Sequence, residues 1–151
     1  MARAIGVIAA AEAGGRAIRD TLLLDCDERR FPRGPFSGLR GTLVEMALPQ
    51  GNPRLRPDDC LVLDDGDLIE ILARPEPLIE IRAADTVALA RLAWLLGDHH
   101  IEAELSGRRL RVRRTASLAA LLTPHDAKLI EIDAPFEPEG GAYEWSGFDI
   151  R

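Results

Sequence analysis

The chain has 151 residues, which is enough for one medium-sized domain or two small ones. Its composition, with 46% hydrophobic and 29% charged residues, is that of an ordinary globular protein, and an aromatic content of only 5% argues against a large aromatic ligand cage. The net charge of -6 argues against nucleic acid as a partner, because phosphate contacts need a basic surface.

The sequence predicts a reduced cytoplasmic protein with no membrane partner. No apolar run is long enough to cross a bilayer, and Glu12 and Arg16 interrupt the apolar start of the chain before it could form a signal-peptide core. The two cysteines, Cys26 and Cys60, do not form a disulfide framework. Both lie beside apolar stretches, so we expect them to be buried as small hydrophobic residues.

Residues 1–74 are expected to form an all-β domain. Short apolar runs separated by Pro- and Gly-rich turns predict strands at 21–24, 42–48, 60–63 and 68–72. The Asp65-Gly66 pair between the last two runs is a typical hairpin turn. Asp64, Asp65 and Asp67 could suggest calcium, but the twelve-residue calcium loop with its final glutamate is missing.

Residues 75–77, Pro75-Glu76-Pro77, are expected to be a stiff linker to a second domain at 78–143. This domain begins with a predicted strand at 78–81, followed by a helix. Asp85 is a suitable N-cap for that helix. An apolar stripe follows from Leu89 to Leu96, and we expect Gly97 to end the helix in the left-handed conformation.

The rest of the second domain alternates between strand and helix patterns. Alternation predicts strands at 101–105 and 109–113, with Ile101, Ala103 and Leu105 facing the core and the charged residues on the other face. A short helix capped by Thr115 and ended by Pro124 precedes a strand at 128–132. The order β-α-β-β-α-β is the ferredoxin-like pattern, so the predicted class is α+β. We expect the tail at 144–151 to be irregular.

The five arginines between Arg108 and Arg114 could indicate an RNA-binding strand. That function needs aromatic residues on the central strands to stack against bases, and the predicted strands have none. We therefore interpret the arginines as one charged face of the sheet, opposite Glu102 and Glu104.

His99 and His100 are the strongest candidates for a functional site. Neutral imidazole is a common ligand for nickel, copper and zinc. Adjacent residues entering a strand point to opposite sides, so the two side chains are not expected to bind one ion together within a chain. A twofold axis would bring the same histidine together twice, which predicts an open, ligand-poor site suited to a carrier. His125 lies in a predicted turn and is expected to be exposed and without a role.

Three segments of the chain have distinctive sequences. They are Ala134-Pro135-Phe136-Glu137-Pro138-Glu139-Gly140-Gly141-Ala142-Tyr143; Ala88-Leu89-Ala90-Arg91 through Leu96-Gly97-Asp98-His99-His100; and Leu61-Val62-Leu63-Asp64-Asp65-Gly66 through Pro75-Glu76-Pro77-Leu78. All three resemble the UreE family of urease accessory proteins, the nickel metallochaperones. The second segment is similar to the family's Leu-Ala-Arg helix, which ends in Leu-Gly-Asn-Arg-His.

The resemblance implies a homodimer that carries nickel to apo-urease together with the other accessory proteins, including the GTPase. It implies that the first domain contacts this machinery and that the second binds metal and dimerises. The family's key histidine corresponds to His100, and His99 stands where the family often has arginine. Many members carry further histidines before the second helix and in the tail. This chain has neither, so the expected capacity is one ion shared by two chains.

The metal itself follows from the resemblance alone, because imidazole also binds zinc and copper. Affinity should fall as pH drops through the histidine range, since the ligand must be deprotonated. The chain is therefore expected to be a metallochaperone and not an enzyme. The alternatives are a protein-interaction module without a metal role and, less favoured, a metal-dependent hydrolase, which would need a further protein ligand and a general base near His100.

Overall fold

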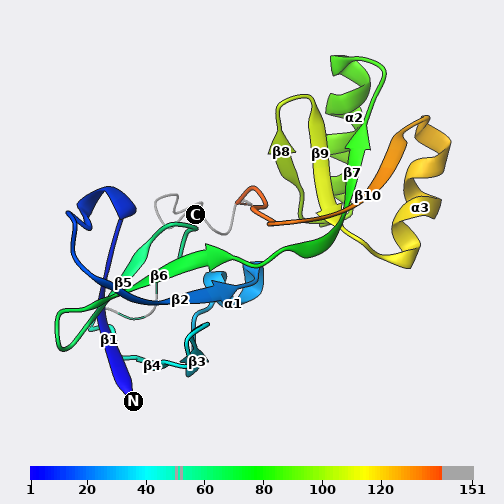
Figure 1. Cartoon of the computed structure of the whole chain (residues 1–151). Coiled ribbons are helices and arrows are strands. Elements are labelled where there is room, and N and C mark those ends of the chain that lie inside the picture. The colour runs from blue at the N-terminus through cyan, green and yellow to red at the C-terminus, as the bar shows by residue number, and fades with distance from the viewer. Residues whose placement is uncertain (50, 52, 141–151) are drawn as a thin grey trace, which may run out of the picture. The chain divides into compact units, whose positions relative to one another are not determined.

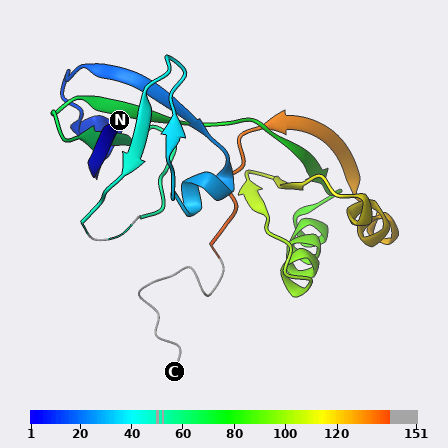
Figure 2. The same cartoon turned by 90° about the horizontal axis from the view of Figure 1, so that it is seen from below.

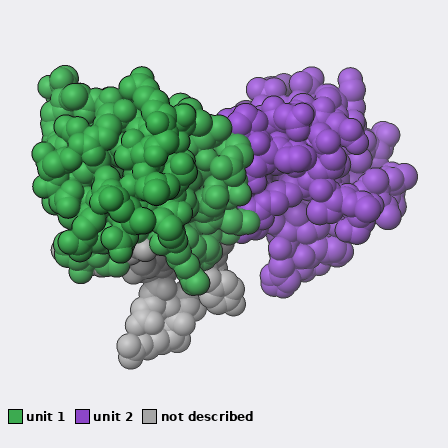
Figure 3. All heavy atoms as spheres, turned by 60° about the horizontal axis from the view of Figure 1, so that its bottom comes forward, with its two compact units in different colours: residues 1–74 green, residues 75–151 purple. Residues whose placement is uncertain are grey.

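The computed structural model describes residues 1–49, 51 and 53–140. The predicted irregular tail at 144–151 lies outside these residues. The protein is a mixed α+β structure rich in strands, and it divides into two compact units, Met1–Arg74 and Pro75–Arg151 (Figure 3). Each unit has its own hydrophobic core.

The first unit is built on a single sheet of strands in the order β2-β6-β5-β1-β4-β3 (Figure 1). The strands are β1 (Ala2–Ile8), β2 (Ile18–Leu24), β3 (Phe36–Ser37), β4 (Leu43–Met46), β5 (Cys60–Leu63) and β6 (Leu68–Ala73). The sheet is almost closed into a barrel, because the amide of Leu39, just after edge strand β3, donates to the carbonyl of Thr21 in edge strand β2 at 2.9 Å. Its apolar interior includes Leu22, Val44 and Leu61.

Asp20 reinforces this closure from inside the fold. Its buried carboxylate accepts hydrogen bonds from the backbone amides of Thr21 at 2.7 Å, Arg40 at 2.9 Å and Thr42 at 3.0 Å. Burial acts to raise the pKa of Asp20, but these amide hydrogen bonds outweigh it and lower the pKa to about 2. Gly38 lies directly against this carboxylate, and a Cβ atom at this position would collide with it.

The first unit is not all-β, which corrects the prediction from sequence. It contains a short 3-10 helix, η1 (Ala10–Glu12), and the five-residue helix α1 (Cys26–Arg30). A capping box starts α1: Asp25 accepts from the amide of Glu28 at 2.8 Å, and Glu28 accepts from the amide of Asp25 at 2.9 Å. Strand β1 was also not predicted. Cys26 and Cys60 are both buried, as predicted.

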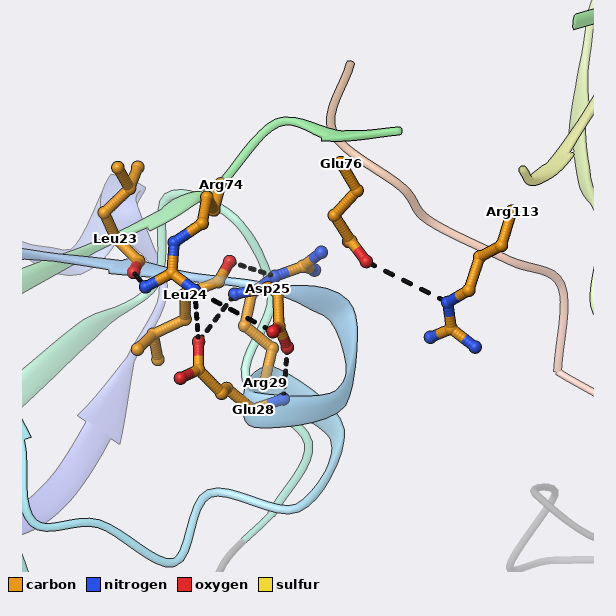
Figure 4. Close-up of polar contacts among 8 residues, drawn as sticks. All are labelled: Leu23, Leu24, Asp25, Glu28, Arg29, Arg74, Glu76 and Arg113. Carbon is orange, nitrogen blue, oxygen red and sulfur yellow. Dashed lines mark hydrogen bonds and ion pairs between the residues drawn. The ribbon is translucent and has the colours of Figure 1, made fainter. Parts of the chain in front are cut away.

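Arg74, the last residue of the first unit, is tied to α1 and β2 (Figure 4). Its guanidinium donates to the carbonyl of Leu23 at 2.8 Å and to Glu28 Oε2 at 3.2 Å. Its amide donates to the carbonyl of Leu24 at 2.8 Å. The short helix and its capping box therefore also hold the end of the unit in place.

The second unit is a sheet in the order β10-β7-β9-β8 in which neighbouring strands are antiparallel. Both of its longer helices lie on the same side of this sheet (Figure 2). The elements are β7 (Glu76–Arg82), α2 (Thr86–Asp98), β8 (Glu104–Ser106), β9 (Arg109–Arg113), α3 (Ala116–Leu122), η2 (Thr123–His125) and β10 (Lys128–Ala134). The main elements follow the order predicted from sequence. The predicted linker at 75–77 is wrong for two of its three residues: β7 begins at Glu76, and both Glu76 and Pro77 pair with β10.

The predicted strand at 101–105 is wrong in its first half. Strand β8 begins only at Glu104, and residues 101–103 follow the helix end as irregular chain. Leu105 is 54% exposed although it pairs with buried Leu110, because β8 is the edge strand of the sheet. Ile101 and Ala103 do pack against the core as predicted.

Candidate metal-binding site

The candidate histidines lie at the C-terminal end of α2. This helix is held by an N-cap and by apolar residues packed against the sheet. Asp85 caps the helix, and its side chain accepts from the amide of Ala88 at 2.8 Å. Leu92 and Leu96 are buried against the sheet strands, with Leu89 partly buried beside them. The prediction of this helix, its cap and its apolar stripe is confirmed.

The helix ends in a Schellman motif, and His100 occupies its left-handed position. The amide of Ile101 donates to the carbonyl of Leu96 at 2.9 Å, and the amide of His100 donates to the carbonyl of Gly97 at 3.0 Å. His100 has φ +55, a conformation that normally favours glycine. Leu96 and Ile101 both pack in the core, which is the usual apolar contact of this motif.

Two predictions about this region are wrong. Gly97 does not end the helix in the left-handed conformation, because it still lies inside α2 and the motif closes three residues later at His100. His99 and His100 also do not enter a strand. His99 is the C-cap of the helix, with φ -88 and ψ 8, and β8 starts four residues after His100. Strand alternation therefore does not act on this pair, and the predicted placement of the two side chains on opposite sides of a strand is wrong.

The chemistry of this helix end suits a cation. Both imidazoles are exposed, and the last carbonyls of a helix carry a partial negative charge that favours cations nearby. In the described part of the chain, no group of three or more His, Cys, Asp or Glu residues is placed to hold a metal ion. His125 lies in η2, where it is exposed as predicted. Within residues 1–49, 51 and 53–140, this helix end therefore offers two neighbouring imidazoles, and a complete coordination shell needs further ligands.

The arginines of β9 form the charged sheet face predicted from sequence. Arg113 Nη1 pairs with Glu102 Oε2 at 2.9 Å, and Arg111 Nη1 lies 4.0 Å from Glu104 Oε1. The calcium alternative also receives no support: Asp65 and Asp67 lie in the predicted hairpin turn and pair with Arg19.

Sequence reasoning missed the centre of this charged face, which is Glu80 in β7. Its side chain is buried and receives Arg82 Nη2 at 3.0 Å and Arg109 Nη1 at 3.0 Å. Burial acts to raise the pKa of Glu80, but the hydrogen bond from Arg82 and the charge of Arg109 outweigh it and lower the pKa. The sequence contained one sign of this buried ion-pair centre: Glu80 interrupts the apolar run from Leu78 to Ile81.

Comparison with known protein families assigns both units. The family model described as "UreE urease accessory protein, N-terminal domain" matches residues 2–74, and the model described as "UreE urease accessory protein, C-terminal domain" matches residues 76–149. The chain belongs to the UreE family. The resemblance read from the sequence is therefore confirmed, and both histidines fall within the C-terminal UreE domain.

Curated relatives named "Urease accessory protein UreE" agree with this assignment. One from Rhodopseudomonas palustris (strain HaA2) is 46% identical over 82% of this chain and 57% of its own length. One from Bradyrhizobium sp. (strain BTAi1) is 45% identical over 84% of this chain and 61% of its own length. One from Beijerinckia indica is 46% identical over 86% of this chain and 75% of its own length.

The chain thus spans less than two thirds of the length of several UreE relatives that it matches. The family and these relatives carry the names of accessory proteins and not of enzymes, which agrees with the predicted absence of catalysis. Among the described residues, no helix is both long and apolar enough to cross a membrane.

Proposed function

We propose that this chain is a urease-maturation protein that carries a nickel ion at a histidine site shared by two copies and passes the ion to apo-urease. The single observation that carries this proposal is the position of His100. The Schellman motif holds its backbone at the end of α2 while its imidazole stays exposed to solvent. Membership of the UreE family supplies the urease context.

A site shared by two copies accounts for the missing ligands. One chain offers His99 and His100 at α2, and a twofold axis near them would double this number. Helix α2 also carries an exposed apolar stripe on its solvent side, with Val87 60% and Trp94 69% exposed. Such a stripe is suited to burial against a second copy, so it supports a homodimer formed through the second unit.

Within this site we assign His100 as the main ligand and His99 as a helper. Nickel is proposed as the cargo because of the family. Zinc or copper can occupy the same imidazoles, since copper binds them more tightly than nickel and zinc about as readily. An open site with few protein ligands releases its ion more readily than a closed structural site.

The remaining assignments extend the proposal to the whole chain. Residues 1–74 would contact partners, namely urease and its other accessory proteins including the GTPase. The second unit, from Pro75 to about residue 143, would form the metal-binding and dimerisation domain, and 144–151 would follow it as a tail. The strand order β10-β7-β9-β8 supports a ferredoxin-like fold for this domain. We place the protein in the cytoplasm, where urease assembly would occur.

Equilibrium dialysis with nickel, combined with sedimentation, tests the site. The wild-type protein is expected to bind about one ion per dimer. His100→Asn should abolish binding, because asparagine tolerates the left-handed conformation but has no imidazole. His99→Asn should only weaken binding, and His125→Asn is the matched control. Unchanged binding by His100→Asn would refute the site, and absence of any metal binding at neutral pH would favour a protein-interaction module.

A further inference from the structure

One face of the second unit's sheet carries a row of positive charges in direct register. Both helices cover the opposite face, where Ile79, Ile81 and Val112 are buried. The strand register places three basic residues of the open face side by side: Arg109 of β9 lies opposite Arg82 of β7, and Arg82 lies opposite Lys128 of β10. Arg82, Arg109 and Lys128 are called the basic row below. Like charges directly opposite each other on a sheet repel, so this arrangement disfavours the isolated fold.

The carboxylates beside the basic row do not neutralise it. Glu80 is the nearest one, and Arg82 and Arg109 share it at 3.0 Å each while Arg111 Nε lies 3.6 Å away. Arg111 Nε is buried and has no hydrogen-bond partner within the described chain. Lys128 is exposed, and none of the described side chains forms an ion pair with it. Glu104 and, near it, Glu139 add two carboxylates, so four cationic groups lie near three carboxylates and an excess of positive charge remains.

We propose that the basic row is a docking site for an acidic segment of a partner protein. A guanidinium has five N–H donors, and Arg109 spends only one of them on Glu80, so donors remain for incoming carboxylates. The patch is also positive on a chain whose net charge is -6, which would orient an acidic partner towards this face. An extended nucleic acid is disfavoured by the rest of the acidic chain.

The basic row is far from the proposed metal site within the same unit. Arg82 ends β7, whereas α2 begins at Thr86 and returns along the other face of the sheet for 13 residues. A helix of this length extends about 20 Å, so the histidines lie at the opposite end from the basic row. A partner held at the basic row would leave His99 and His100 accessible. The proposal therefore does not depend on nickel binding.

Fluorescence anisotropy with a labelled peptide of about eight glutamates tests the docking site. The wild-type protein should bind the peptide at about 50 mM salt and lose most of this binding at about 300 mM salt. Arg109→Gln combined with Lys128→Gln should weaken binding about fivefold, as expected for the loss of two exposed ion pairs. The control is Arg33→Gln combined with Arg56→Gln, which removes the same charge from exposed positions of the first unit.

Glu80→Gln provides a test in the opposite direction. Removal of the internal carboxylate frees Arg82 and Arg109, so the peptide should bind about threefold more tightly even if the variant unfolds at a lower temperature. A purely structural role for the arginines predicts no such gain. Equal binding by the Arg109 and Arg33 double variants would overturn the proposal, as would tighter binding of an oligothymidylate or of pyrophosphate than of the peptide. Nickel binding should be unchanged in all of these variants, which separates this test from that of the metal site.

Discussion

The amide of Ile101 donates to the carbonyl of Leu96 at 2.9 Å, and this bond places His100 between two core residues. The backbone of His100 is consequently fixed by packing on both sides while its side chain is exposed. The position would suit a glycine better than any other residue, because φ is +55. The backbone strain of a non-glycine residue at this φ is a cost to folding, and the presence of a histidine despite this cost supports a functional role for its imidazole.

Substitution His100→Gly should separate folding from metal binding. The variant is expected to be about 0.5–1 kcal/mol more stable than the wild type, because glycine relieves the left-handed strain. It should bind no nickel if His100 is the main ligand. Urea denaturation and equilibrium dialysis measure the two effects. A loss of stability in His100→Gly would show instead that the imidazole makes contacts that hold the helix end.

Trp94→Glu should weaken a homodimer without unfolding the protein. Trp94 is 69% exposed, so the monomer loses little when it is replaced. A tryptophan buried at the centre of a dimer interface commonly contributes about 2 kcal/mol, which corresponds to a dissociation constant about thirtyfold higher. Sedimentation velocity over a concentration series measures this. Phe31→Glu is the control, because Phe31 is 64% exposed in the first unit, and an equal effect of both variants would argue against α2 as the interface.

Asp20 should make the first unit sensitive to acid. The folded pKa is lowered to about 2, whereas an aspartate in an unfolded chain titrates near about 3.9. A depressed folded pKa stabilises the protein fully above about pH 4, and this stabilisation is lost as pH falls towards about 2. Asp20→Asn should thus be less stable at neutral pH, and its deficit relative to the wild type should shrink below about pH 4. A deficit independent of pH in chemical denaturation would contradict this prediction.

Gly38→Ala should destabilise the same region by steric conflict. The added methyl group collides with Asp20 Oδ2 and must displace the carboxylate from its amide donors. An overpacked site of this kind typically costs about 1–3 kcal/mol. Thermal unfolding measures the effect, and Gly97→Ala is the comparison, because nothing lies within 4 Å of a Cβ atom at that helical position. Equal unfolding temperatures for the two variants would show that Asp20 can move freely.

The two helix caps of the second unit should differ in energetic value. Asp85 accepts from the amide of Ala88 at 2.8 Å, whereas Thr115, at the N-cap of α3, makes no capping hydrogen bond with its side chain. Asp85→Ala is expected to cost about 1 kcal/mol and Thr115→Ala only a few tenths of this. Denaturant unfolding of both variants compares them directly, and a larger loss for Thr115→Ala would contradict the assignment.

The sequence by itself determined most elements of the second unit. The apolar stripe of α2, the alternation in β9 and the Asp-Gly hairpin of the first unit are local patterns, and each produced the expected element. The family was recognised differently, from three segments that resemble UreE sequences, and one of these segments contains the two histidines. Local patterns succeed here because the periodicity of buried side chains is set by the geometry of a single helix or strand.

Only the tertiary structure decided where the charged and strained residues lie. The near-closure of the first sheet depends on the Asp20 carboxylate, which accepts hydrogen bonds from the amides of Arg40 and Thr42. These two residues are distant from Asp20 in the sequence. The basic row exists because the strand register aligns Arg109, Arg82 and Lys128 across three strands. The left-handed residue that ends α2 is His100 and not the predicted Gly97. Burial of Ile101 against the core outweighed the preference of glycine for a left-handed position. Such choices depend on contacts between distant segments, and no local pattern contains them.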